Sequence, residues 1–180
     1  MPLRVAENRR AGRWNFVRVG TTQYASLDVE APFAEMLRQE GLRTEAEVTT
    51  FYSTIWQLKI SEGVVGDYGT FEKAESAGFP PEALVDDDHE CCQREAQRLV
   101  NLGAGGVLSP SAALPGSTNL TLFGPRVPIE WSADVKIASA IPAQPLATGQ
   151  PPAGLVKRVR HYGETHSGLA TYVVRRSAGT

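Results

Sequence analysis

Cysteine is scarce in this chain: two of its 180 residues are cysteines, and they are adjacent, at Cys91 and Cys92. An adjacent pair is a poor basis for a disulfide framework, and it lacks the C-x-x-C spacing of a zinc site. A protein without such a framework suits a reducing compartment. We therefore expect a cytoplasmic protein.

Long apolar runs and a strong charge of one sign are also lacking. No apolar stretch approaches the roughly 18 residues that a membrane span needs, and none of the signal-peptide kind follows Met1. The formal net charge is −2 and the isoelectric point about 5.9. Such a balance gives no reason to expect a nucleic acid or an anionic membrane as a partner. Any ligand must therefore be recognised by a local group of residues, because the net charge of the chain gives no general attraction.

The chain does have enough apolar residues for one sizeable core: 42% are hydrophobic, which favours a single domain over residues 1–180. β-Branched and aromatic residues predict strands at 21–26 and within 48–60. Apolar residues at helical spacing predict one helix that Gly41 ends and a second that begins near Asp87 and ends at Gly103. A weaker helical signal lies at 70–76.

Glycines 103, 105 and 106 follow a helix instead of opening one, so a phosphate-binding loop does not fit. They lead into two predicted strands, at 107–109 and 119–123. Further strands are predicted at 129–131 and 135–137, and a Pro/Ala-rich connector at 140–154. The end of the chain, 155–160 and 170–176, predicts a basic β-hairpin. His161 and His166 lie in its turn, and we expect neither to be catalytic.

A candidate site lies near the start of the chain. Arg13, Tyr24 and Glu35 fall on a predicted loop, strand and helix that follow one another. Trp14 would bury and hold the loop, so that the arginine can present its planar fork to a phosphate. A cation, an aromatic face and a carboxylate near one strand end suit a nucleotide. Periodicity alone, however, favours a solvated surface position for Glu35.

An ordered set of short motifs between residues 12 and 123 resembles the RES domain family. The set is Gly-Arg-Trp-Asn at 12–15, Tyr-Ala-Ser at 24–26, Ala-Glu at 34–35, Ser-Pro-Ser at 109–111 and Asn-Leu-Thr-Leu-Phe at 119–123. The resemblance implies a compact α+β domain, with twisted, mostly antiparallel sheets flanked by helices, related to the ADP-ribosyltransferases.

The same resemblance implies the chemistry. Family members are typically toxins of Xre-RES toxin–antitoxin pairs that act on NAD+, so an Xre-type antitoxin is the expected partner. Arg13, Tyr24 and Glu35 match the family's active-site residues. Ser111 matches its serine, with Ser109 as the fallback, and Asn119 would help to bind the nucleotide. Inorganic phosphate is a possible co-substrate, and no metal is required.

Three functions stay open on this resemblance. The first is cleavage of NAD+ by hydrolysis or phosphorolysis, the second is transfer of ADP-ribose to a specific protein, and the third is a non-catalytic binding domain. The third is kept because the chain departs from the family pattern in two places. Phe16 stands where the family often has proline, and no residue before Gly12 convincingly supplies the family's upstream arginine-bearing strand.

Overall fold

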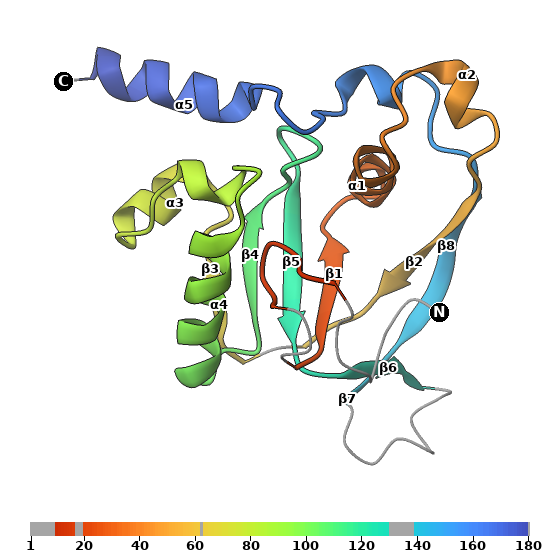
Figure 1. Ribbon diagram of the computed structural model, residues 1–180. Coiled ribbons are helices and arrows are strands. Elements are labelled where there is room, and N and C mark those ends of the chain that lie inside the picture. Colours follow the sequence, from red (N-terminus) through yellow and green to blue (C-terminus); the bar gives the residue numbers. More distant parts are fainter. Residues whose placement is uncertain (1–9, 17–19, 62, 130–138, 180) are drawn as a thin grey trace.

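A four-stranded sheet lies at the centre of the computed structural model, which describes residues 10–16, 20–61, 63–129 and 139–179 (Figure 1). The strand order is β1, β5, β4, β3; the first two pairings are antiparallel and the last is parallel. The bounds are β1 Thr22–Ser26, β3 Val65–Asp67, β4 Gly106–Pro110 and β5 Thr118–Phe123. The register sets Ser26, Asn119 and Ser109 side by side across three strands.

Helix α1, Glu30–Glu40, follows β1 directly and carries Glu35 to this end of the sheet (Figure 1). Asp28 accepts a hydrogen bond from the Ala31 N–H at 2.9 Å and so satisfies a free donor of the first turn. Gly41, with φ 70°, ends the helix in the left-handed conformation that glycine adopts without strain. The predicted helix and its stop are confirmed.

Two hydrophobic clusters hold the sheet between its helices. One joins Trp14 and the sheet to α3 and α4, and the other joins α1 to residues near the end of the chain. Helix α3 is Phe71–Ser76 and α4 is Glu90–Asn101. Both were predicted, and Gly103 follows α4 with a positive φ of 81°. The α+β architecture with mostly antiparallel sheets and flanking helices is thereby confirmed.

Strands β2, Ser53–Leu58, and β8, Ala143–Gly149, form a separate antiparallel ribbon. The connector expected at 140–154 is therefore wrong over 143–149, and also over 140–141, which belong to a further strand. Pro145 is tolerated because it lies opposite Trp56, next to a register shift where a missing N–H costs little. The strand expected within 48–60 is confirmed as β2, whereas Val48 ends helix α2, Glu45–Val48, which Thr44 and Glu47 cap reciprocally. Strands β6, Arg126–Pro128, and β7, Ser139–Ile141, pair in parallel.

The predicted C-terminal hairpin is wrong. The chain forms a single-turn 3-10 helix, η3, at Leu155–Arg158, and helix α5 at Ser167–Ala178, which runs along one side of the molecule (Figure 1). Val173 and Val174 give this segment the look of a strand, yet both are exposed, and the buried residue is Tyr172. Packing of one aromatic side chain outweighs the β-propensity of its neighbours. Apart from Ile129, the strands expected at 129–131 and 135–137 lie outside the described residues.

Candidate functional site

Glu35 is the centre of a polar cluster at the end of the sheet. Its Oε1 accepts hydrogen bonds from Ser111 Oγ and from Asn119 Nδ2, both at 2.8 Å. Ser111 directly follows β4, and Asn119 lies on β5, so three elements converge on one carboxylate oxygen. Among the described residues, Glu35 forms no ion pair. Its negative charge is held by two neutral donors.

The two donors are themselves oriented. Ser111 is fully buried, and its Oγ accepts from the Leu114 N–H at 3.0 Å, which leaves the hydroxyl hydrogen for Glu35. The Asn119 amide oxygen accepts from the Ser26 hydroxyl, so its amino group faces Glu35. Linked hydrogen bonds of this kind polarise one another and restrain the side chains. The carboxylate is thus held in one orientation before any ligand arrives.

The loop at 12–15 forms the second part of the site. Gly12 and Asn15 pair through both of their backbone groups, at 3.0 and 3.3 Å. The Tyr24 hydroxyl accepts from the Trp14 N–H at 3.0 Å and donates to Asn15 Oδ1 at 2.7 Å. A Cβ on Gly12 would lie 2.6 Å from that hydroxyl, so only glycine fits there. Strand β1 therefore holds the loop through Tyr24.

Trp14 anchors the same loop in the core. Its ring stacks with Tyr68 and packs against Phe79, and its Nε1 donates to Ser109 Oγ at 3.3 Å. Ser109 is therefore engaged with the tryptophan, whereas Ser111 contacts Glu35 directly. Of the two serines proposed from the sequence, the geometry therefore favours Ser111 over Ser109 as the partner of the Glu35 carboxylate.

Arg13 projects from this loop and is half-buried, with Nη1 donating to the Ala83 carbonyl at 3.2 Å. Arg13 and Glu35 both lie close enough to Tyr24 to influence its ionisation. The Tyr24 side chain is 50% exposed, but its hydroxyl end is enclosed. That enclosure raises the pKa of Tyr24 above its ordinary value. The phenol stays neutral, and one part of its ring faces solvent.

Further positive charge borders the cluster. Arg38, on the same helix as Glu35, is 4% exposed and pairs with Asp87 at 2.6 Å. Burial lowers the pKa of Arg38, and nearby Glu35 opposes that effect. Burial, together with the charges of Arg13 and Arg38, lowers the pKa of His89 to about 4. The imidazole is therefore neutral at pH 7, and the positive charge comes from the arginines.

The structure thus brings Glu35, Ser111 and Asn119 into direct contact, and it places Tyr24 near enough to both Arg13 and Glu35 for their charges to act on it. Two contributors carried no signal in the sequence: Gln93, which donates to the Gly12 carbonyl at 2.9 Å, and His166, whose Nε2 lies 3.1 Å from the Ser111 carbonyl. Both act on the backbone of residues far away in the chain. Spacing along the sequence does not predict such contacts.

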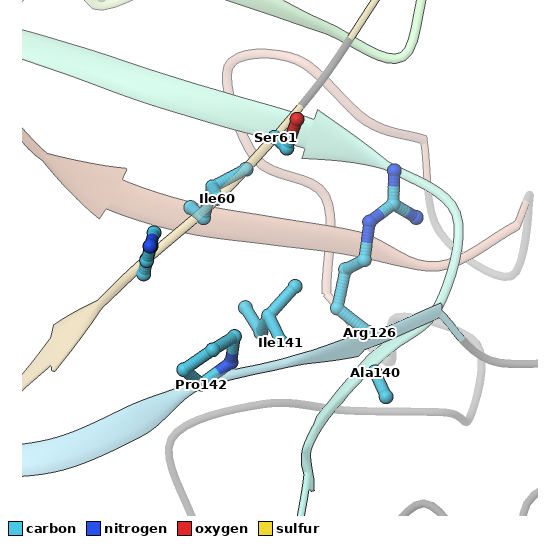
Figure 2. A pocket seen from close by; sticks show the side chains of 7 residues that line it. Ile60, Ser61, Arg126, Ala140, Ile141 and Pro142 are labelled. Atoms are coloured by element: carbon cyan, nitrogen blue, oxygen red, sulfur yellow. The ribbon is translucent and has the colours of Figure 1, made fainter.

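A cavity of about 320 Å³ lies at the opposite end of the sheet, beyond the end of β5. Figure 2 shows Arg126, Ile141 and Ser61 among its lining side chains. It contains none of the residues predicted for the site. In the part of the chain that the structure describes, no group of histidine, cysteine and acidic residues is arranged to hold a metal ion. No helix among those residues is long and apolar enough to cross a membrane.

Comparison with known proteins supports the sequence resemblance. The chain matches a solved structure described as the M. tuberculosis MbcT–MbcA toxin–antitoxin complex, with a TM-score of 0.58 and 19% identity over 85% of this chain and 78% of the other. At that identity the likeness concerns the fold. No curated protein matches the chain. The family model for the RES domain matches residues 2–146. Since that match covers most of its length, the chain belongs to the RES domain family.

Proposed function

We propose that this protein is a toxin that cleaves the nicotinamide–ribose bond of NAD+. The observation that carries the proposal is the state of Glu35. Its carboxylate is oriented by two neutral donors, forms no ion pair with any described residue, and lies near enough to the half-exposed Tyr24 to act on its ionisation, as does Arg13. A negative charge held ready in this way suits a reaction that develops positive charge.

Cleavage of that bond is such a reaction. As the C–N bond breaks, its electron pair passes to the nicotinamide nitrogen, and the ribose becomes oxocarbenium-like. The ring nitrogen is cationic in NAD+, so nicotinamide leaves neutral and needs no strong acid. A carboxylate hydrogen-bonded to the ribose stabilises the developing charge, and its fixed orientation removes the cost of reorganisation. Glu35 would have this role, and an oxygen of the acceptor would then bond to the ribose carbon.

The neighbouring residues suit the rest of the dinucleotide. Arg13 would bind the pyrophosphate, because a guanidinium can donate two parallel hydrogen bonds to phosphate oxygens. The exposed part of the Tyr24 ring would pack against nicotinamide. Ser111 and Asn119 would keep Glu35 in place while substrate binds.

The toxin role rests on the family and on the solved structure that the fold matches, which is described as a toxin–antitoxin complex. By analogy, an Xre-type antitoxin would bind this chain and cover the surface around Arg13 and Glu35. A toxin of this kind would stop growth by depleting NAD+ when the partner is absent.

The test is to incubate the purified chain with NAD+, with and without inorganic phosphate, and to separate the products by chromatography. Glu35→Gln is the matched control, since it keeps the shape of the side chain and removes the charge. Loss of NAD+ that this substitution abolishes supports the proposal. Free ADP-ribose identifies water as the acceptor, and a phosphorylated product identifies phosphate.

The remaining outcomes separate the alternatives. ADP-ribose attached to a protein of a cell extract, without turnover by the chain alone, would replace the proposal with a protein-directed transferase. Binding of NAD+ without any reaction, under all these conditions, would indicate a non-catalytic nucleotide-binding domain. The absence of binding would overturn the site itself.

A further inference from the structure

The strongest observation outside the predicted site concerns His166, which directly precedes helix α5. Its side chain is 4% exposed, and both ring nitrogens are engaged. Nδ1 accepts a hydrogen bond from the Leu169 N–H at 3.1 Å, which caps the helix, and Nε2 lies 3.1 Å from the Ser111 carbonyl. One imidazole therefore links the C-terminal helix to the serine that holds Glu35.

The two contacts together assign the tautomer. A nitrogen that accepts from a backbone N–H carries no hydrogen, so Nδ1 is bare and the proton of the neutral ring is on Nε2. The Nε2–H then donates to the Ser111 carbonyl. Phe71 contacts the ring at its edge, with 5.7 Å between centroids, and prevents it from swinging away. The donor is therefore fixed in direction as well as in protonation state.

The backbone N–H, the hydroxyl and the carbonyl of Ser111 all form hydrogen bonds. Its N–H donates to the Ser117 carbonyl at 2.8 Å, its hydroxyl is held between Leu114 and Glu35, and its carbonyl accepts from His166. The His166 contact is the only one of these made by a residue beyond the matched family region, which ends at 146. The family match alone would not draw attention to it.

We infer that His166 is a positioning residue, which fixes Ser111 and through it the carboxylate of Glu35. This inference rests on the proposed function for its catalytic readout. The hydrogen bonds of the His166 ring go to Ser111 and Leu169 and not to Glu35, so its effect on the carboxylate would pass through Ser111. Without the link, the serine loop loses one of its anchors, and the Ser111 hydroxyl that helps to orient Glu35 loses part of its restraint. A catalytic group displaced by as little as about 1 Å loses much of its rate.

The groups around His166 keep it neutral, as this role requires. Burial lowers its pKa below the ordinary value, the hydrogen bond to the Ser111 carbonyl opposes that shift, and the charges of Arg160, Arg38 and Arg13 add to it. His166 also lines a cavity of about 220 Å³ together with Arg160 and the acidic residues Glu82, Asp86 and Glu164. Protonation of Nδ1 would remove the acceptor that caps α5.

Two substitutions of His166 separate its hydrogen bond to the Ser111 carbonyl from its hydrogen bond to the Leu169 N–H, which caps α5. His166→Asn keeps a short acceptor suited to capping a helix but is too short to reach the Ser111 carbonyl. His166→Gln can place its amide N–H near the position of Nε2 and gives up the cap. His161→Asn is the control, because His161 is also buried but makes no contact with Ser111.

We expect His166→Asn to lower kcat for NAD+ cleavage, corrected for the folded fraction, roughly ten- to a hundredfold, with KM within about threefold and a fall in thermal midpoint no larger than that of His166→Gln. His166→Gln should recover most of kcat while its thermal midpoint falls, and His161→Asn should leave kcat unchanged. A purely structural role predicts the reverse, with activity following the thermal midpoint across all three variants. That result would overturn the inference.

A second readout does not depend on activity. In ¹⁵N-histidine-labelled protein, His166 should show the Nε2–H tautomer at pH 7, and Ser111→Gly should leave this signal in place, because the contact is to the backbone carbonyl. If the unmodified chain does not cleave NAD+, the proposed function fails and this measurement still tests the link. An Nδ1–H tautomer or a protonated ring at pH 7 would contradict the assignment.

Discussion

Glu35 and Asp87 are two carboxylates with opposite surroundings. Asp87 pairs with Arg38 at 2.6 Å and Arg160 at 3.0 Å, and it accepts from the Gly163 N–H at 2.6 Å. Burial opposes its ionisation, but these partners outweigh that effect, and the pKa of Asp87 lies below its ordinary value. Glu35 is held by a hydroxyl and an amide, with no ion pair among the described residues.

The two carboxylates differ in whether an ion pair within the protein compensates their negative charge. The charge of Asp87 is compensated within the protein, where it ties α1 to the chain around 160 and stabilises the fold. The charge of Glu35 is oriented without an ion pair among the described residues, and on the proposed function it would act on a ligand. Burying or orienting a charge without a counter-charge costs stability, and the cost is tolerated where function uses it. The comparison predicts that neutralising each carboxylate changes a different property.

The largest effect is expected for Glu35→Gln. Glutamine keeps an oxygen that can accept from Ser111 and Asn119, so the fold should persist. The rate of NAD+ cleavage should fall roughly a thousandfold, the scale of losing one preorganised electrostatic contact in an active site. Turnover assays beside thermal unfolding curves measure both properties. Turnover within tenfold of the unmodified chain would contradict the assigned role.

Asp87→Asn should have the opposite result. The substitution leaves the buried guanidinium of Arg38 without its counter-charge, and we expect a loss of about 2 kcal/mol in the free energy of unfolding. Measured by urea denaturation, this loss should come with a change of no more than about threefold in NAD+ turnover of the folded protein, because no reacting group is touched. An unchanged midpoint of urea unfolding would show that the charge of Asp87 does not stabilise the fold.

Tyr24→Phe sharpens the comparison within the site, by changing geometry without changing charge. The phenylalanine ring is retained, but the Trp14 N–H and Asn15 lose the hydroxyl that holds their loop. Because Arg13 is on that loop, KM for NAD+ should rise by about five- to tenfold with a smaller change in kcat, consistent with the loss of one or two hydrogen bonds. Steady-state kinetics at several NAD+ concentrations separate the two constants. An effect confined to kcat would place the hydroxyl in the chemistry instead.

The smallest effect is a dependence of stability on pH. Burial lowers the pKa values of His89, His161 and His166, so the unfolded chain binds more protons than the folded one once the pH falls below about 6.5. The free energy of unfolding should therefore be highest above that value and decline toward pH 5. Asp87 contributes nothing to this decline, because its stabilisation is lost only below about 3.8. Urea titrations at pH 7.5, 6 and 5 test this, and a rise toward pH 5 would reverse the sign.

The sequence predicted a helix or strand correctly where the residues that determine it lie within or next to that element. Helix α1 was predictable because its apolar stripe, its glycine stop and Asp28 before it all lie within the segment. Strands β4 and β5 were likewise predicted from residues within each strand. Helix α5 was missed because its valines favour a strand, while its real determinants are the burial of Tyr172 and the cap from His166.

The site shows the same limit. Periodicity favoured a solvated position for Glu35, and the resemblance to a family made a functional role the favoured interpretation. Its partners are 76 and 84 residues further along the chain, at Ser111 and Asn119, and the sheet register brings them together. His166 lies another 55 residues beyond Ser111 and binds a backbone carbonyl, which has no sequence signature.

The most direct test of the central claim is the rate of nicotinamide release from NAD+ by Glu35→Gln and Asp87→Asn, measured side by side and corrected for the folded fraction of each. If Glu35 supplies the free negative charge, the Asp87→Asn rate will exceed the Glu35→Gln rate by roughly a hundredfold or more. Equal rates would contradict the claim that these two carboxylates have different uses.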